Sequence, residues 1–266
     1  MRINIHGRWV LLPMVCLLVA TLGLIGCNGN TSVAVGGSTT VQPLTEKWRD
    51  AYEANHEDID VTVEGGGSTA GVAGVSDGRF DIGAISRDLK SSEKEQWPEL
   101  VDHAVAYDGV AIVVHPSNPN GITDITLEEI ANIFEQGSTS TWTVVSREEG
   151  SGTRETFENR VMGDMEIASS AEFQTSNGAI KQKVANTENA IGYLSLGYVD
   201  DSVQAITVDG IECAIATVQD SSYPIARILY LVTWNEPEGE IKDFIDFAKS
   251  SEGQQIVEDE GYIAII

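Results

Sequence analysis

Residues 141–163 read TWTVVSREEGSGTRETFENRVMG, and this stretch shows the unit from which the fold is built. The apolar run before Arg147 predicts a strand, and the run that begins at Arg154 predicts a helix. Between them, residues 150–153 form a turn of glycines and small hydroxyl residues. A helix N-terminus presents free backbone N–H groups and a partial positive charge, and the two arginines flank this turn. The segment therefore predicts a strand–turn–helix unit whose turn can bind an anion.

The same design of strand, glycine-rich turn and helix occurs at two further places, GGSTT at residues 36–40 and GGGST at residues 65–69. Glycine lets the backbone approach a ligand closely and the hydroxyl groups add directed donors, so such a site needs little net positive charge. Anion binding is therefore compatible with a formal net charge of -25, which argues against binding of nucleic acid or anionic lipid headgroups. The structural alternative is that each turn is an ordinary helix cap. Nucleotide binding is disfavoured, because the sequence contains neither a P-loop nor a dinucleotide-binding glycine motif at its first strand–turn–helix unit.

Strand and helix patterns alternate after the N-terminal segment, which predicts an α/β architecture with helices on both sheet faces. Strands are expected near residues 32–37, 59–64, 80–86, 105–116, 141–147, 190–196, 203–211 and 225–234, and helices near residues 40–55, 68–78, 126–137, 154–163, 176–187, 239–250 and 251–261. A capping box at Thr126 and Glu129 marks one helix start, and Ser176 is expected to cap another.

The chain has no long linker between two halves, so two lobes require it to cross between them more than once. The expected crossings lie near residues 107–113 and 221–231. We therefore predict one lobe from residues 33–110 plus 222–266 and a second lobe from residues 111–221.

The N-terminal segment is predicted to be an export signal. Arg2 and Arg8 precede an uncharged apolar run that ends at Cys27. The sequence LIGC that closes this run resembles a lipobox, which predicts a signal peptide at residues 1–26 and a lipidated tether at residues 27–32, with the lipid on Cys27. The protein would then be extracytoplasmic and anchored to the cell membrane by its lipid. The run is also about as long as a short membrane span, and an uncleaved anchor is the open alternative.

The stretch FDIGAISRDL at residues 80–89 adds a carboxylate, Asp81, where a strand meets a turn. A carboxylate beside an anion is repulsive unless the anion still carries a proton, which the carboxylate then accepts in a hydrogen bond. Phosphate near neutral pH has such a proton and sulfate does not, so Asp81 favours phosphate as the ligand. The structural alternatives are that Asp81 pairs with Arg79 or Arg87, and that Arg147 pairs with an adjacent glutamate.

The sequence offers little support for catalysis. His56, His103 and His115 lack the spacing of metal ligands, and GSGT is not the Gly-x-Ser-x-Gly nucleophile elbow. Cys213 lies in an apolar stretch and is expected to be a buried small hydrophobic residue. We therefore predict a binding protein that is not an enzyme and that needs no metal or cofactor. A surface phosphatase is the disfavoured alternative.

Several of these stretches occur together, in this order, in one known family. They are GGSTTVQPLTEKW, GGGSTAGV, DIGAISRDL, REEGSGTRETF, AIGYLSLGYV, YPIARILYLVTW and SSEGQQIVEDEGYIAI. From about Ser32 to the C-terminus the chain resembles the phosphate-binding proteins of ABC phosphate importers, in the class II periplasmic-binding-protein family. The resemblance implies a two-lobed α/β fold, in which each lobe is a central mixed sheet flanked by helices and crossing segments form a hinge.

The resemblance also implies which residues bind phosphate. They are Ser38, Thr39, Thr40, Ser68, Asp81, Arg147, Ser151, Gly152 and Thr153. Thr39 and Thr40 would bind chiefly through backbone N–H groups, and Asp81 would accept the phosphate proton. Ser86 and Arg87 belong to a Ser-Arg version of the family motif, and they either contact the ligand or only brace Asp81.

The function implied by the resemblance is high-affinity binding of inorganic phosphate outside the membrane and its delivery to the permease subunits of an ABC importer. The two lobes would close over a dehydrated phosphate, with no catalytic step. The expected form is a monomer. Two alternatives keep the fold: a binding protein for sulfate, molybdate or tungstate, and a phosphate sensor that does not transport.

Overall fold

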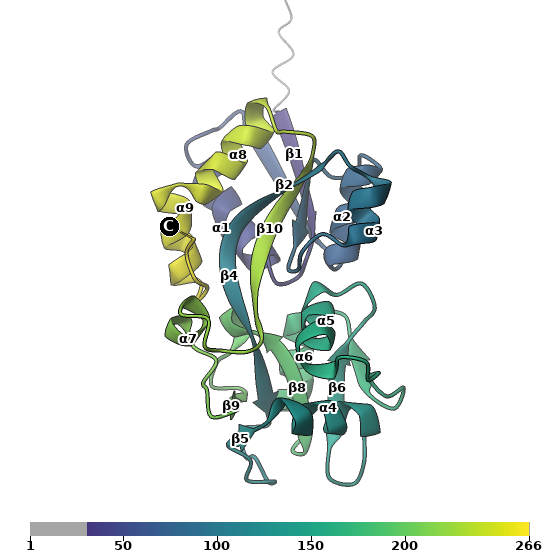
Figure 1. The fold of residues 1–266 in the computed structure, drawn as a ribbon. Helices are drawn as coiled ribbons and strands as arrows, with labels where there is room; N and C mark the ends of the chain where they lie inside the picture. The colour runs from purple at the N-terminus through teal and green to yellow at the C-terminus, as the bar shows by residue number, and fades with distance from the viewer. Residues whose placement is uncertain (1–30, 266) are drawn as a thin grey trace, which may run out of the picture.

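The computed structural model describes residues 31–265, in which strands and helices alternate along the chain (Figure 1). In chain order the elements are β1 (Thr31–Gly37), α1 (Gln42–Glu53), β2 (Ile59–Gly65), α2 (Ser68–Ser76), β3 (Ile82–Ile85), α3 (Ser91–Gln96), β4 (Leu100–Val114), β5 (Asp124–Ile125), α4 (Leu127–Gln136), β6 (Thr143–Arg147), α5 (Gly152–Phe157), η1 (Glu158–Met162), β7 (Glu172–Gln174), α6 (Asn177–Ala185), β8 (Ala190–Ser195), η2 (Leu196–Tyr198), β9 (Gln204–Val208), α7 (Ile215–Gln219), β10 (Ala226–Trp234), α8 (Gly239–Lys249) and α9 (Ser251–Asp259). The predicted signal peptide and Cys27 lie outside the described residues. The predicted tether is too long at its end, because Thr31 and Ser32 already belong to β1.

The strands of residues 31–265 form one mixed sheet in the order β2-β1-β3-β10-β4-β8-β6-β7, with β9 paired to β4 and β5. Strands β1, β2 and β3 are parallel, so their carboxyl ends lie at the same edge of the sheet. The long strand β4 pairs with β10 along residues 100–109 and with β8 along residues 110–114. In Figure 1, β4 and β10 run side by side from the upper half of the molecule into the lower half.

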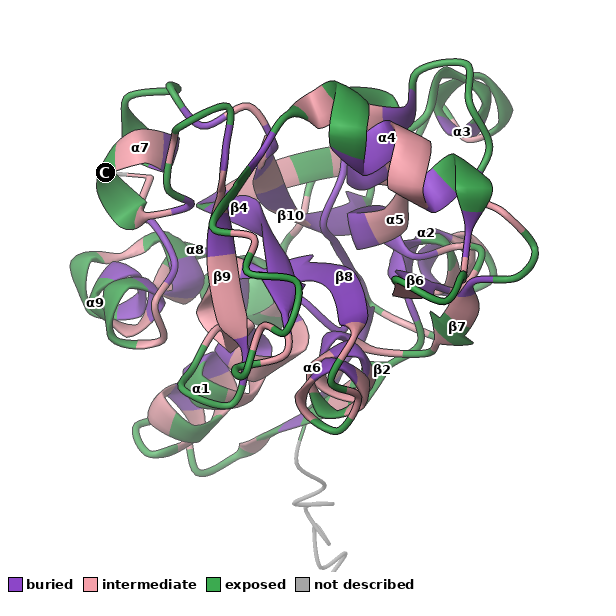
Figure 2. Ribbon diagram, turned by 90° about the horizontal axis from the view of Figure 1, so that it is seen from below, coloured by how far each residue is buried: buried purple, intermediate pink, exposed green. Residues whose placement is uncertain are grey.

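Two buried clusters lie on either side of this crossing. One is built from residues of the ranges 33–106 and 229–262. The other comes mainly from residues 110–225 and includes Phe157 and Tyr193, whose stacked rings have centroids 4.1 Å apart. Figure 2 shows β4 and β8 of the second cluster as buried strands, with α4 and α5 above them and α6 below. The molecule is therefore a two-lobed α/β protein, as the sequence predicts.

Local sequence signals explain where the longer helices begin and which face they bury. α1 has Pro43 in its first turn, where a missing N–H leaves no intrahelical hydrogen bond unmade, and it buries Leu44, Trp48 and Tyr52 at a spacing of four residues. The predicted capping box at the start of α4 is present, because Thr126 accepts a hydrogen bond from the Glu129 N–H. Ser176 likewise caps α6 and Cys213 is buried, so both of these predictions are confirmed.

The predicted helix at residues 154–163 is divided in the structure. α5 ends at Phe157, and the π-helical turn η1 follows over Glu158–Met162. Phe157 and Met162 are both buried, and the i→i+5 hydrogen bonds of a π-helix bring residues five apart onto one face. Elements α3, β5, β7 and α7 have no counterpart among the predicted elements, because two to six residues are too few to show a period.

Candidate functional site

The three glycine-rich turns of the sequence meet where the two lobes face each other. In the first lobe the carboxyl ends of β1, β2 and β3 bring Ser38, Ser68 and Ser86 together. The Ser38 hydroxyl donates to Ser86 Oγ at 3.0 Å, and the oxygens Ser68 Oγ and Ser86 Oγ are 3.3 Å apart. We call these three residues, together with Thr40 and Thr153, the hydroxyl cluster. All five are buried.

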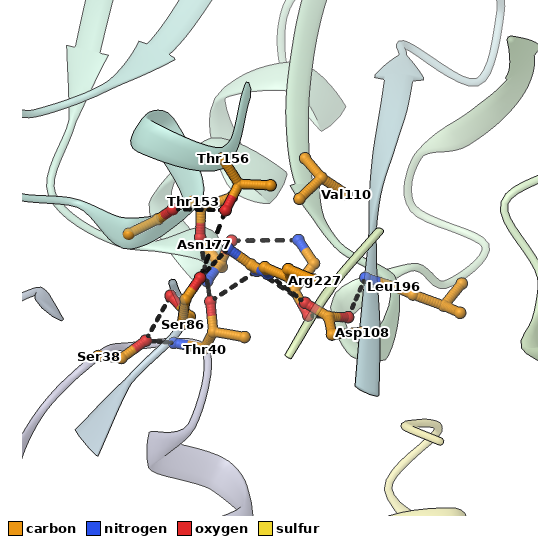
Figure 3. Close-up of polar contacts among 12 residues, drawn as sticks. Ser38, Thr40, Ser86, Asp108, Val110, Thr153, Thr156, Asn177, Leu196 and Arg227 are labelled. Carbon is orange, nitrogen blue, oxygen red and sulfur yellow. Dashed lines mark hydrogen bonds and ion pairs between the residues drawn. The ribbon is translucent and has the colours of Figure 1, made fainter. Parts of the chain in front are cut away.

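Thr40 is the member of the hydroxyl cluster with the most polar neighbours (Figure 3). Its Oγ1 lies 3.1 Å from Thr153 Oγ1, which belongs to α5 in the second lobe. It also accepts hydrogen bonds from Asn177 Nδ2 at 2.8 Å and from Arg227 Nη2 at 3.2 Å. Four segments that are far apart in the sequence therefore converge on one hydroxyl group.

The turn at residues 150–153 shapes the candidate site through its backbone conformation as well as through its side chains. Gly150 has φ 86°, a conformation that favours glycine, and Ser151 caps α5 by accepting a hydrogen bond from the Arg154 N–H. A Cβ atom placed on Gly152 would lie 2.3 Å from Ser68 Oγ, so a side chain at this position would collide with the first lobe. The glycine thus lets the N-terminal turn of α5 reach the hydroxyl cluster of the other lobe.

Arg147 lies at the end of β6, and its side chain is buried. Its Nη2 donates to Thr39 Oγ1 at 3.3 Å, which places the guanidinium against the first turn of the other lobe. Its Nε and Nη2 also donate to the carboxylate of Glu148, each at 2.8 Å. Arg147 therefore has the adjacent glutamate as a partner, and its guanidinium also contacts a turn of the other lobe.

The structure contradicts the assignment of Asp81 to the anion site. Asp81 is exposed and precedes β3, whereas Ser86 follows it, so at about 3.3 Å per residue the two Cα atoms are roughly 16 Å apart. The Asp81 carboxylate accepts a hydrogen bond from the Ala34 N–H at 2.8 Å instead. The sequence places a carboxylate near the motif, but the extended strand carries it to the opposite end of the sheet.

Of Ser86 and Arg87, whose roles the sequence leaves open, only Ser86 belongs to the hydroxyl cluster. The Arg87 side chain is buried and turns to carboxylates, with ion pairs of 2.7 Å to Glu93 and 2.9 Å to Glu155. Glu155 is on α5 of the second lobe and also pairs with Lys90 at 2.8 Å. Arg87 therefore links the lobes beside the site.

Three residues near the hydroxyl cluster are missing from the sequence-based set: Asn177, Asp108 and Arg227. Asp108 is fully buried and receives hydrogen bonds from Arg227, from Ser195 Oγ at 2.9 Å and from the Leu196 N–H at 3.2 Å. Burial raises the pKa of Asp108, while the neighbouring guanidinium and these hydrogen bonds oppose the rise. The sequence contained a signal for two of them, because Asp108 is the one aspartate, glutamate, lysine or arginine of the strand predicted near residues 105–116 and Arg227 the one of the strand predicted near residues 225–234.

Comparisons with known proteins agree with this architecture. The family model for the PBP superfamily domain matches residues 28–252. The phosphate-binding protein PstS of Bacillus subtilis (strain 168) is 35% identical in an alignment that covers 88% of this chain and 81% of the relative. The chain belongs to the PstS phosphate-binding family of the PBP superfamily. The fold is the class II fold expected from the sequence.

Two solved structures of this family extend the match to three dimensions. One is a substrate-binding protein from Clostridium perfringens, assigned to a phosphate ABC transporter and solved with bound phosphate. It is 37% identical, with a TM-score of 0.83, and the match covers 89% of this chain and all of that chain. The other is an ABC-type phosphate transport receptor from Vibrio cholerae, 31% identical with a TM-score of 0.72 over 87% of this chain and 99% of that chain.

Two further observations concern only residues 31–265. None of the helices there has the length and apolar composition needed to cross a membrane. The same residues contain no group of three or more histidine, cysteine, aspartate or glutamate side chains arranged to hold a metal ion.

Proposed function

We propose that this protein binds inorganic phosphate outside the membrane and delivers it to an ABC phosphate importer without catalysing a reaction. The observation that carries the proposal is the hydroxyl cluster, in which buried hydroxyl groups of both lobes meet, with Thr40 Oγ1 3.1 Å from Thr153 Oγ1. The names of the family members in the comparisons, a phosphate-binding protein and phosphate transport receptors, support the same ligand.

The chemistry of the cluster suits a small tetrahedral anion. Hydroxyl groups can donate to any oxygen of the anion or accept its proton, and the N-terminal turn of α5 supplies oriented backbone N–H groups. Arg147 and Arg227 add guanidinium donors from the two sides, each guanidinium being paired with a carboxylate, and the chain as a whole is strongly acidic. Binding is therefore a local property of the cleft rather than of the net charge.

The two lobes would move apart to admit phosphate and close over it when it is bound. Strands β4 and β10 connect the lobes, and bending there would open the hydroxyl cluster to solvent. We take residues 33–110 plus 222–266 and residues 111–221 as the moving units, in a protein that acts as a monomer. A lipid on Cys27 would keep the protein beside the permease subunits that receive the phosphate.

The position of Asp81 favours a second ligand class, sulfate or another tetrahedral oxyanion. The carboxylate that would have rejected sulfate, Asp81, is at the far end of its strand. Two carboxylates beside the arginines of the site, Asp108 and Glu148, already accept hydrogen bonds from those arginines. A binding protein for sulfate or another tetrahedral oxyanion is therefore the alternative, and a phosphate sensor would show the same binding.

The test is a calorimetric titration of anion-free protein with phosphate and, separately, with sulfate. We expect phosphate to bind. Thr40→Val keeps the shape of the side chain but removes the hydroxyl group that holds Thr153, Asn177 and Arg227 in place. It should weaken phosphate binding by about 1–3 kcal/mol, because these groups lose the contact that positions them.

The matched control is Thr45→Val, which changes a buried threonine whose hydroxyl only bonds the Val41 carbonyl of its own helix. This variant should keep the wild-type affinity. Binding of sulfate in place of phosphate would transfer the assignment to the other oxyanion class. Binding of neither anion would mean that the three turns are only helix caps.

A further inference from the structure

A buried ion pair lies where the chain passes between the lobes. Asp108 on β4 and Arg227 on β10 are directly opposite each other in the antiparallel ladder. β4 exchanges β10 for β8 as its partner just beyond this point, at Val110. The side chains are 0% and 3% exposed, so the charges are withdrawn from water at the centre of the hinge.

The Arg227 guanidinium extends from this pair to the hydroxyl cluster (Figure 3). Its Nε and Nη2 donate to Asp108 Oδ2 at 2.9 and 2.7 Å. Its Nη1 donates to the Ser86 carbonyl and its Nη2 to Thr40 Oγ1, each at 3.2 Å. A guanidinium has five N–H donors, and these contacts with the described residues use four of them. The fifth, the second N–H of Nη1, can serve an anion.

The Asp108 carboxylate, by contrast, has no acceptor position left for a ligand. Its Oδ1 accepts from Ser195 Oγ and from the Leu196 N–H, and its Oδ2 accepts twice from Arg227. A carboxylate offers about four acceptor positions, so Asp108 cannot also accept the proton of a bound anion. Its contacts fix the guanidinium in one orientation and join β4, β8 and β10.

The energetics argue that this pair serves more than stability. A buried ion pair must offset the desolvation of both charges, and well-packed apolar residues often stabilise a fold equally well or better. The strand residues next to Asp108 and Arg227 are apolar apart from Tyr107, so the strands themselves do not require a charge at this point. The contacts of Arg227 with Thr40 and Ser86 instead place its charge at the hydroxyl cluster, where it can bind an anion.

We infer that Arg227 is a second anion-binding guanidinium, which reaches the ligand from the hinge, and that Asp108 is the residue that positions it. The inference rests on the proposed function, because the ligand class is the tetrahedral oxyanion of the same site. It adds a ligand-binding residue on β10, between the turns of the two lobes.

The experiment measures phosphate affinity by calorimetry on the full-length protein, three variants of the pair and one control variant, with thermal unfolding in the absence of phosphate as a check of folding. Arg227→Gln combined with Asp108→Asn removes both charges and leaves a neutral hydrogen-bonding pair. We expect this double variant to bind phosphate at least about 30-fold more weakly. Arg227→Lys keeps a charge but loses the planar fork, and it should recover only part of the affinity.

The variant Asp108→Asn distinguishes two effects of Asp108 on phosphate affinity, the positioning of Arg227 and the repulsion between its own negative charge and the anion. Removing a negative charge beside an anion site should tighten anion binding if charge alone mattered. If Asp108 positions Arg227, the affinity should fall by about tenfold although the site becomes more positive. Arg49→Gln, which removes an arginine charge from the surface of α1, is the control and should stay within about twofold of wild type.

The outcomes are distinguishable. If the wild-type protein does not bind phosphate, the proposed function fails. If it binds phosphate and the folded double variant binds within about threefold of it, Arg227 does not contact the ligand and the inference is overturned. Tighter binding by Asp108→Asn would overturn the positioning role. If the double variant does not fold, wild-type affinity in Arg227→Lys would likewise overturn the contribution of the guanidinium fork.

Discussion

At the scale of single residues, Asp81 shows how position along a strand decides what a carboxylate does. Its Oδ2 accepts from the Ala34 N–H, and its own N–H donates to the Ala34 carbonyl. Asp81 therefore ties the amino-terminal end of β3 to β1, while the hydroxyl cluster lies at the carboxyl-terminal end. A charge that is exposed and this far from the cluster is largely screened by water and salt.

We accordingly predict that Asp81→Asn leaves phosphate affinity within about twofold of wild type. The asparagine carbonyl can still accept from Ala34, so thermal stability should change by less than about 1 kcal/mol. Calorimetry on Asp81→Asn beside Thr40→Val makes the comparison direct. A tenfold or larger loss in Asp81→Asn would return this carboxylate to the binding site.

At the scale of secondary-structure elements, α4 is specified by its own sequence. Thr126 and Glu129 satisfy each other's backbone N–H groups at the first turn, and Ile130, Ala131 and Phe134 form the buried face. Gly137 ends the helix with φ 74°. These contacts belong to the second lobe and involve none of the residues of the hydroxyl cluster.

Thr126→Ala should therefore destabilise the protein by about 1 kcal/mol, because the Glu129 N–H loses its acceptor. For a chain of this size the unfolding midpoint should fall by about 2–4 °C, while phosphate affinity stays unchanged. Differential scanning calorimetry and titration calorimetry measure the two quantities. Thr175→Ala, at an exposed threonine, is the control, and an equal shift in both variants would contradict the capping role.

At the scale of the whole molecule, ion pairs beside the site join the lobes. Glu155 of α5 lies 2.9 Å from Arg87 and 2.8 Å from Lys90, which both come from the other lobe. The Arg87 side chain is 3% exposed and the Glu155 side chain 23%, so this contact is better protected from solvent than an ordinary surface pair. Such a contact favours the arrangement in which the lobes touch.

Glu155→Gln should thus shift the protein toward separated lobes. We expect a larger radius of gyration by small-angle X-ray scattering without phosphate, and about fivefold weaker phosphate binding, since about 1 kcal/mol of closure is lost. Glu158→Gln is the matched control, because the Glu158 ion pair with Arg154 lies within the second lobe. Identical scattering and affinity for the two variants would show that the link between lobes is without effect.

The sequence by itself determined the longer helices and strands and the three glycine-rich turns of the site. Periodicity and capping residues act over a few positions, so α1, α4 and α6 and the three glycine turns could be placed without knowing the fold. The turns carry Ser38, Thr40, Ser68 and Thr153, and these residues do meet in the structure.

The tertiary structure alone decided the rest of the site. Asp81 and Ser86 are five residues apart, but an extended strand holds them at opposite ends of the sheet. Asp108 and Arg227 are 119 residues apart, yet the antiparallel ladder of β4 and β10 sets them face to face beside Thr40. Such neighbours depend on strand register and on closure of the two lobes, and neither of these is encoded in the local pattern of residues.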